Sequence, residues 1–107
     1  MNKMKAMVLA ASTAALSLGV VSTASADAVA LATKSGCMAC HQIDNKVVGP
    51  AYKEVAAKYK GQADAVDMLS AKVKAGGAGV WGPVPMPPNA AVSEADIKTI
   101  VTWIMSL

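Results

Sequence analysis

Cys37, Cys40 and His41 form a Cys-x-x-Cys-His sequence, and the chain contains no other cysteine or histidine. Four kinds of site use two thiols at this spacing: a disulfide, half of a zinc site, a redox-active thiol pair and the attachment point of a haem. Each of them demands a different surrounding fold, so this short segment constrains the chain more than any other feature of its sequence.

The histidine that directly follows the second cysteine distinguishes these alternatives. A zinc site needs two further Cys or His ligands, which the sequence lacks, and a thioredoxin-like pair follows a strand, whereas this sequence has helical periodicity. A disulfide between cysteines this close would close a very small loop and add little stability. Cys-x-x-Cys-His is the attachment sequence of a c-type haem. The sequence therefore predicts one covalently bound haem c.

The chemistry of attachment explains the spacing. Side chains three and four residues apart are neighbours on a helical turn, about 5–6 Å apart at Cβ. The thiols of Cys37 and Cys40 are thereby placed to add to two vinyl groups along one edge of the haem, and His41 can reach the iron from one face. We expect thioethers at both cysteines and an iron ligand at His41.

Residues 1–26 have the features of an export signal. A basic start (MNKMK) is followed by an uncharged, largely apolar stretch, and Ala-Ser-Ala at 24–26 has the small-x-small pattern of a signal peptidase site. We expect cleavage after Ala26, which leaves residues 27–107 as one domain in the periplasm. Charged residues interrupt every later apolar run, so no membrane insertion is expected after cleavage.

The composition of residues 27–107 indicates a need for apolar material from outside the chain. The lysines there nearly balance the acidic residues, with a net charge of about +1, which argues against a nucleic-acid partner. The chain has no phenylalanine, and its aromatic residues are Tyr52, Tyr59, Trp81 and Trp103. A domain this small buries little apolar surface by itself. A haem would supply the missing bulk, and we expect the cofactor-free protein to fold poorly.

Glycine and proline divide the domain into four helical segments. We expect helices within residues 27–36, 50–61, 64–77 and 92–107, and no strand pattern competes with them. Asp27 is a candidate N-cap of the first helix. Pro50 is expected at the first helical position of the second, where its missing N–H costs nothing.

The last segment has the clearest helical signals. Ser93 and Asp96 have the spacing of a capping box at its start. The apolar residues that follow recur every three or four positions, which predicts a buried face made by Ile97, Ile100, Val101 and Ile104. The domain is therefore expected to be all-α.

Met86 lies in a glycine- and proline-rich segment, within the sequence Pro-Val-Pro-Met-Pro-Pro. No second histidine is available for the other face of the iron, so a methionine is the natural candidate. Met38 lies between the cysteines and cannot reach that face, whereas Met68 and Met105 fall in helices, where core packing is the ordinary role. The flanking prolines restrict the backbone and favour Met86 as the sixth ligand. Ligation by His and Met raises the reduction potential and suits electron transfer.

Three stretches of the sequence carry a likeness to a known family. They are GCMACHQID, VGPAYKEVAAKY and GVWGPVPMPPNA, followed by the closing helix. Over residues 27–107 the chain resembles the small class I bacterial cytochromes c of the cytochrome c-551/c-552 group. The resemblance implies a class I cytochrome c fold, in which about four helices surround one covalent haem with His41 and Met86 on its iron. The first and last helices would cross, with Trp103 near the contact.

The resemblance also implies roles for four residues around the haem. The Pro50 carbonyl would accept a hydrogen bond from the second ring nitrogen of His41 and so fix the ring. The Trp81 indole would donate to a haem propionate, and Lys72 stands near a propionate where such proteins often have arginine. Asn89 would lie near the sulfur of the methionine ligand and tune it.

The function implied is that of a monomeric periplasmic electron carrier, which cycles between Fe(III) and Fe(II) and is not an enzyme. Its donor would be a redox protein such as a membrane quinol–cytochrome c oxidoreductase, and its acceptor a nitrite reductase, a peroxidase or a terminal oxidase. The alternative is a small haem enzyme or gas sensor with a displaceable Met86. That alternative needs a distal acid–base group, and the sequence offers no second histidine for it.

Overall fold

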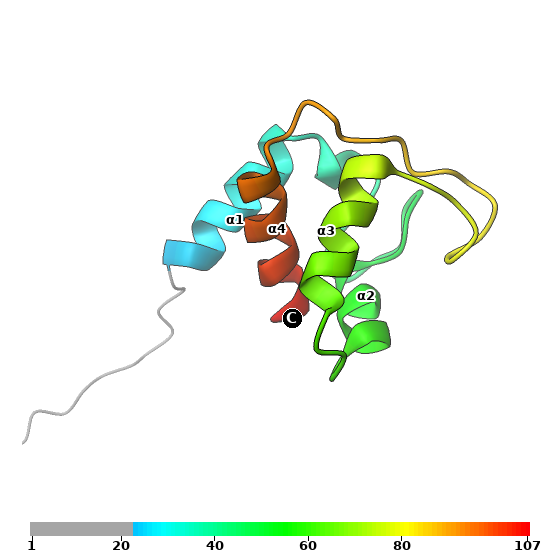
Figure 1. The fold of residues 1–107 in the computed structure, drawn as a ribbon, viewed down its shortest axis with the longest axis horizontal. Coiled ribbons are helices and arrows are strands. Elements are labelled where there is room, and N and C mark those ends of the chain that lie inside the picture. Colours follow the sequence, from blue (N-terminus) through cyan, green and yellow to red (C-terminus); the bar gives the residue numbers. More distant parts are fainter. Residues whose placement is uncertain (1–22) are drawn as a thin grey trace, which may run out of the picture.

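A computed structural model describes residues 23–107, and within that range it contains four α-helices, one short 3₁₀-helix and no named strand. In chain order the helices are α1 (Thr23–Lys34), η1 (Cys37–Ala39), α2 (Tyr52–Tyr59), α3 (Ala65–Ala75) and α4 (Glu94–Met105). α4 packs against α1, α2 and α3, while the long segment between α3 and α4 runs over one end of the helices (Figure 1). The all-α architecture expected from the sequence is confirmed.

The hydrophobic core is small and is organised by α4. Among the described residues only eleven apolar side chains are fully buried, and five of these are alanines. The predicted buried face of α4 is confirmed, because each of its residues is buried, and Trp103 is buried beside them. Ala28 and Ala32 of α1 lie in the same cluster as Trp103. The first and last helices are therefore in contact, as the resemblance implied.

Two helix ends follow the sequence signals closely. The Ser93 side chain caps α4, because its Oγ accepts a hydrogen bond of 3.1 Å from the Asp96 amide. Gly76 follows the last residue of α3 and has a φ of 74°, a left-handed conformation that glycine adopts at little cost. The start of α4 and the end of α3 are thus defined locally, and together they fix the two ends of the long connecting segment.

The start of α2 differs from the sequence prediction. α2 begins at Tyr52 with Ala51 as its N-cap, so Pro50 precedes the helix instead of opening it. The Pro50 carbonyl oxygen lies 2.8 Å from Nδ1 of His41, and Ala51 then adopts an extended conformation before the helix starts. A long-range contact of Pro50 therefore outweighs its preference for the first helical position.

The start of α1 also differs, since the helix begins at Thr23 and not at Asp27. Two alanines, Ala24 and Ala26, lie among the residues ahead of Asp27 and favour a helix, so α1 extends through them in the uncleaved chain. Most of the predicted signal peptide, residues 1–26, lies outside the described residues. None of the described helices is both long enough and apolar enough to cross a membrane.

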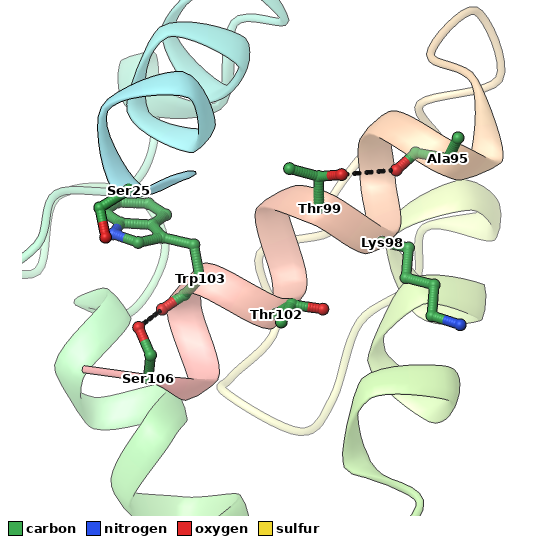
Figure 2. A pocket seen from close by; sticks show the side chains of 7 residues that line it. All are labelled: Ser25, Ala95, Lys98, Thr99, Thr102, Trp103 and Ser106. Atoms are coloured by element: carbon green, nitrogen blue, oxygen red, sulfur yellow. Dashed lines mark hydrogen bonds between the residues drawn. The ribbon is translucent and has the colours of Figure 1, made fainter. Parts of the chain in front are cut away.

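A hollow of about 510 Å³ lies beside α4 and the start of α1 (Figure 2). The residues that line it include Ser25, Lys98 and Thr102, together with Trp103, and most of the lining surface is apolar. None of the residues predicted to hold a haem lines it. Ser25 precedes the expected cleavage point, so cleavage there would remove one of the residues that line this hollow.

Candidate functional site

The two cysteines and the histidine lie on a single tight turn. Gly36, with a φ of 83°, precedes η1 and reverses the chain after α1. The amides of Cys40 and His41 both donate to the Cys37 carbonyl, at 3.2 and 3.0 Å. Residues i and i+3 of a 3₁₀ turn are eclipsed, so the side chains of Cys37 and Cys40 leave the turn on the same side. Both thiols are free and half-buried.

Three contacts hold the His41 ring. Its Nδ1 lies 2.8 Å from the Pro50 carbonyl oxygen, which can only accept, so Nδ1 carries the proton and Nε2 has the lone pair. The Tyr52 ring stacks on the imidazole, with centroids 5.1 Å apart and planes inclined by 18°. Gly49 lies against the ring so closely that a Cβ there would be 2.5 Å from Cε1. The tautomer and the orientation of His41 are both defined.

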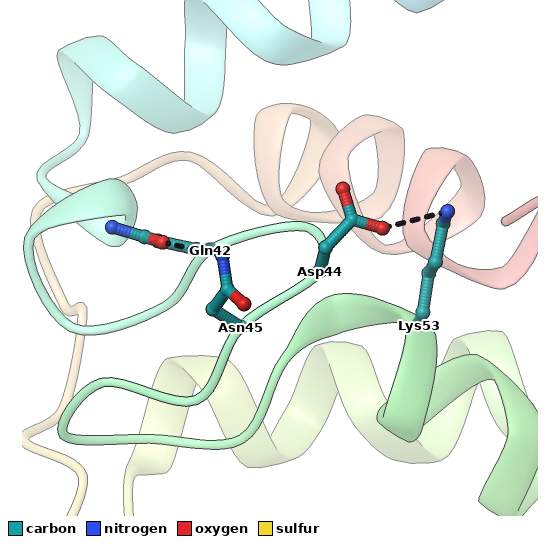
Figure 3. A network of polar contacts seen from close by, with 4 residues as sticks. All are labelled: Gln42, Asp44, Asn45 and Lys53. Atoms are coloured by element: carbon teal, nitrogen blue, oxygen red, sulfur yellow. Dashed lines mark hydrogen bonds and ion pairs between the residues drawn. The ribbon is translucent and has the colours of Figure 1, made fainter.

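Contacts within the segment that joins η1 to α2 fold it into a closed loop. They bring Pro50 next to His41. The Gly49 amide donates to the Cys40 carbonyl at 2.8 Å. Figure 3 shows the side-chain contacts of this segment, made by Lys53 with Asp44 (2.7 Å) and by Asn45 with Gln42 (3.4 Å). These side chains are exposed, and such an ion pair contributes only about 0–1 kcal/mol, so the backbone bonds carry most of the closure.

Burial raises the pKa of two groups beside the turn. Desolvation raises the pKa of the Cys37 thiol above its ordinary value, and a hydrogen bond with Tyr52 offsets part of this rise. The pKa of the Tyr52 hydroxyl is also raised, mainly by burial and further by the neighbouring Cys37. Both groups are therefore protonated near neutral pH in the folded chain.

Met86 is fixed to the end of α3 by its backbone. Gly77 and Met86 exchange two backbone hydrogen bonds, of 2.8 and 3.0 Å, in an antiparallel bridge. A Cβ on Gly76 would lie 2.5 Å from the Met86 carbonyl oxygen, so only glycine allows the two segments to approach this closely. Prolines on both sides restrict the backbone further, and the Met86 side chain is half-buried.

Asn89 ties the same segment to α3. Its side-chain amide donates to the Val73 carbonyl at 3.1 Å and to the Pro87 carbonyl at 3.3 Å, and its own backbone amide also donates to Val73 at 3.2 Å. Both N–H groups of the side chain are thus given to backbone carbonyls. In this structure Asn89 holds the loop to α3. The contact with the methionine sulfur implied by the resemblance stays a prediction.

Lys72 lies in α3, and Trp81 lies in the first half of the loop that follows it. Lys72 extends over Gly77, with its Nζ 2.7 Å from the position that a Cβ of that glycine would take. The Trp81 side chain is 38% exposed, and Nζ of Lys58 lies 5.6 Å from the centroid of its ring. Lys58 therefore places positive charge beside the Trp81 indole, whose N–H is a donor, and this arrangement suits a carboxylate.

Sequence reasoning missed two of the contacts that hold His41. The stacking of Tyr52 on the imidazole has no signal in the helical periodicity. Gly49 attracted no separate prediction. One signal was available for Gly49. No predicted turn or helix end there requires a glycine, and an unexplained glycine can indicate that another group approaches the backbone closely.

Comparison with known proteins identifies the family. The sequence profile of cytochrome c matches residues 25–107. The chain belongs to the cytochrome c family. It is 62% identical over 88 residues to cytochrome c-551 of Allochromatium vinosum, an alignment that covers 82% of this chain and 93% of that protein. It is 53% identical over 94 residues to cytochrome c-552 of Nitrosomonas europaea, covering 88% of this chain and 90% of that protein.

Comparison of the fold with solved structures identifies the same group of cytochromes. The crystal structure of wild-type Nitrosomonas europaea cytochrome c552 aligns with a TM-score of 0.72 at 53% identity, covering 74% of this chain and 98% of that one. The small class I cytochrome c of the c-551/c-552 group, expected from the sequence, is confirmed. Membership of this family implies a covalently bound haem and a role in electron transport.

The described residues fit a covalent haem. The two thiols on the η1 turn are free, and within residues 23–107 no three side chains of the His, Cys, Asp or Glu types converge to hold a metal ion by themselves. Large apolar side chains also remain exposed among the described residues: Val47, Val48, Met68, Val80, Trp81, Val84 and Leu107. Only Ala65 of α3 is fully buried. A large apolar group bonded to the turn would supply the missing packing partner.

Gly49 provides a test of how closely the imidazole is held. We expect Gly49→Ala to displace the ring of His41, because the new Cβ would lie within 3.0 Å of three ring atoms. The cost of such overpacking is about 1–3 kcal/mol. Denaturant unfolding of the haem-loaded protein measures the loss, and the visible spectrum reports the altered iron site.

Gly61→Ala is the matched control. A Cβ on Gly61 would meet nothing within 4 Å, although its φ of 83° makes the change mildly strained. We expect this variant to lose some stability but to keep the wild-type spectrum. If Gly49→Ala showed a wild-type spectrum and full stability, the close contact between Gly49 and His41 would be wrong.

Proposed function

We propose that the chain is a periplasmic electron carrier with one covalent haem c. Cys37 and Cys40 would form the thioether bonds, and His41 and Met86 would ligate the iron. The bound group supplies one-electron chemistry, the interconversion of Fe(III) and Fe(II). The protein's part is to hold both ligands at fixed positions, because an electron carrier works best when its iron site changes little between the two states.

The paired backbone of Gly77 and Met86 is the observation that carries this proposal. Two hydrogen bonds and two flanking prolines restrict the segment, so a methionine bound to iron there would close the sixth position. An enzyme or gas sensor needs that position to open for substrate. A closed position favours electron transfer over chemistry at the iron.

The other ligand is held by the chain in an equally defined way. The Pro50 carbonyl accepts the Nδ1 proton of His41, which keeps Nε2 available for the iron and makes the imidazole a stronger donor. The Tyr52 ring stacked on the imidazole resists its rotation. Together these contacts would maintain one ligand geometry in both oxidation states.

Two further residues would contact the haem propionates. Trp81 would donate its indole N–H to one propionate, and Lys72 would place its charge near a propionate. Lys58, which lies over the Trp81 ring, adds positive charge in the same region. Asn89 would stabilise the methionine ligand by fixing the loop that carries it.

Export and partners follow from the same proposal. Residues 1–26 would be removed as a signal peptide, and residues 27–107 would act as a monomer in the periplasm. Donors of the quinol–cytochrome c oxidoreductase type and acceptors such as a nitrite reductase, a peroxidase or a terminal oxidase would meet it through brief contacts. Val47 and Val48 are 46% and 51% exposed, and they provide a small apolar area for such contacts.

Carbon monoxide separates the carrier from the enzyme or sensor. We expect the reduced wild-type protein to bind this gas slowly or hardly at all near neutral pH, because Met86 occupies the sixth position. The visible spectrum of the oxidised and reduced protein, recorded with and without carbon monoxide, measures this. Rapid binding would contradict the carrier proposal and support the alternative.

A further inference from the structure

Lys74 makes two contacts that the proposed function does not explain. From the last turn of α3, its Nζ donates to the carbonyl oxygens of Ala90, at 3.2 Å, and of Val92, at 2.9 Å. These acceptors lie 16 and 18 residues further along the chain, just before α4. Within residues 23–107 Lys74 takes part in no ion pair. Among the described residues the ammonium group of Lys74 therefore hydrogen-bonds to backbone carbonyls and not to a carboxylate.

The two acceptors stand at the far end of the segment that carries Met86. That segment leaves α3 at Gly76, pairs with Gly77 through the backbone of Met86, and returns to α3 through Asn89. Lys74 completes the series by holding Ala90 and Val92 to the same helix. The backbone of Met86 is thus held by Gly77, and the residues that follow it are held by Asn89 and Lys74. All of these contacts are made to the last turns of α3 or to the residues just after them.

The chain between Met86 and the Lys74 contacts is stiff. Pro87 and Pro88 fix two φ angles directly after the methionine, and Asn89 is held by Val73. A displacement at Ala90 would therefore be transmitted towards Met86, because little free rotation remains between them. A hydrogen bond from an ammonium group is stronger than one between neutral groups, which makes Lys74 an effective anchor.

We propose that Lys74 is a positioning residue that sets how firmly Met86 stays bound to the iron. The inference rests on the proposed His/Met ligation and adds a residue that touches neither haem nor ligand. For the methionine to leave the iron, its segment must move away from the haem, and the hydrogen bonds of Lys74 to Ala90 and Val92 oppose that movement. Loss of these bonds makes the open form of the loop more populated.

Imidazole added to the ferric protein measures this opening, since it binds iron only when Met86 has left. We expect Lys74→Met, which keeps the length of the side chain but removes its donors, to bind imidazole about tenfold more tightly, equal to about 1.4 kcal/mol. Lys74→Arg restores the donors and should return the affinity towards that of the wild type. Lys98→Met is the matched control, because Lys98 is an exposed lysine of α4, and it should bind imidazole like the wild type.

Two further measurements separate this role from general stability. All affinities are measured at denaturant-free conditions far from unfolding, where a loss of global stability alone leaves imidazole binding unchanged. In a Met86→Ala background, Lys74→Met should have no further effect, because no methionine remains to be displaced. If Lys74→Met fails to fold, Lys74→Gln is measured with the same criterion.

The outcomes distinguish this inference from the proposed function. If Met86→Ala opens the iron to imidazole while Lys74→Met binds no more tightly than Lys98→Met, the role of Lys74 is wrong and the ligation stands. An equal gain in the Met86→Ala background would also overturn it, since the effect would then not pass through the methionine. If Met86→Ala leaves imidazole binding unchanged, the ligation and this inference both fail.

Discussion

Cys37→Ala and His41→Ala should each lose most of the covalently bound haem. The cysteine change would remove one of the two proposed thioether bonds, and the histidine change would remove the proposed iron ligand, whose ring is held by Pro50 and Tyr52. Because the polypeptide core is so small, the fraction without haem should also be largely unfolded. Haem staining after denaturing electrophoresis measures attachment, and far-ultraviolet circular dichroism measures folding.

Ala39→Ser is the control within the same turn. Ala39 lies between the two cysteines and is exposed, so this variant should attach haem as the wild type does. A Cys37→Ala variant with full covalent haem would contradict the thioether at that position. Wild-type protein without any covalent haem would reject the cofactor altogether.

Met86→Ala should open the iron and lower its reduction potential. Without the thioether, the reduced protein should bind carbon monoxide readily, whereas the wild type should not. The potential should fall by about 0.1–0.3 V, a part of the ~0.8 V range over which axial ligands set haem potentials, because the methionine favours Fe(II). Redox titration and the spectrum under carbon monoxide measure the two effects.

Met68→Ala and Met105→Ala are the controls for this prediction. Met68 is 37% exposed, with its sulfur 3.6 Å from Nε2 of Gln62, and Met105 is half-buried at the end of α4. Neither change should alter the potential or carbon monoxide binding, and each should cost only about 1–2 kcal/mol of stability, below the range for fully buried methionines. An unchanged spectrum in Met86→Ala would mean that a different side chain holds the iron.

The helices were predictable because their signals are local. Ser93 and Asp96 stand at capping distance in the sequence, and the structure places a hydrogen bond between them. The periodic apolar face of the last helix is buried as predicted. Apolar residues that repeat with a period near 3.6 lie on one side of a helix, and that side packs against the core. Predictions were wrong where a distant contact competes with a local preference. The start of α2 is an example, because the Pro50 carbonyl accepts a hydrogen bond from His41 and the helix begins only at Tyr52.

The site was predictable only where its residues are close in sequence or chemically rare. A lone histidine next to the second of two cysteines leaves few alternatives, so the turn could be interpreted from the chain alone. Lys74 could not be found in this way, because its acceptors are carbonyls of residues on another segment and any residue type could supply them. Gly49 was missed for a similar reason, since its importance lies in a ring that approaches it in space.

The contact between α1 and α4 has a consequence for the order of events during biosynthesis. Cys37 packs against the cluster that contains Ala28, Ala32 and Trp103, so the last helix to be synthesised covers part of the turn that is synthesised much earlier. If the chain is exported as proposed, its cysteines would be more accessible for as long as α4 is absent or undocked. Haem attachment at the proposed cysteines would then be easiest in that interval, and the bond would persist through later unfolding and refolding. Maturation would thus be a single step that precedes the contact between the first and last helices.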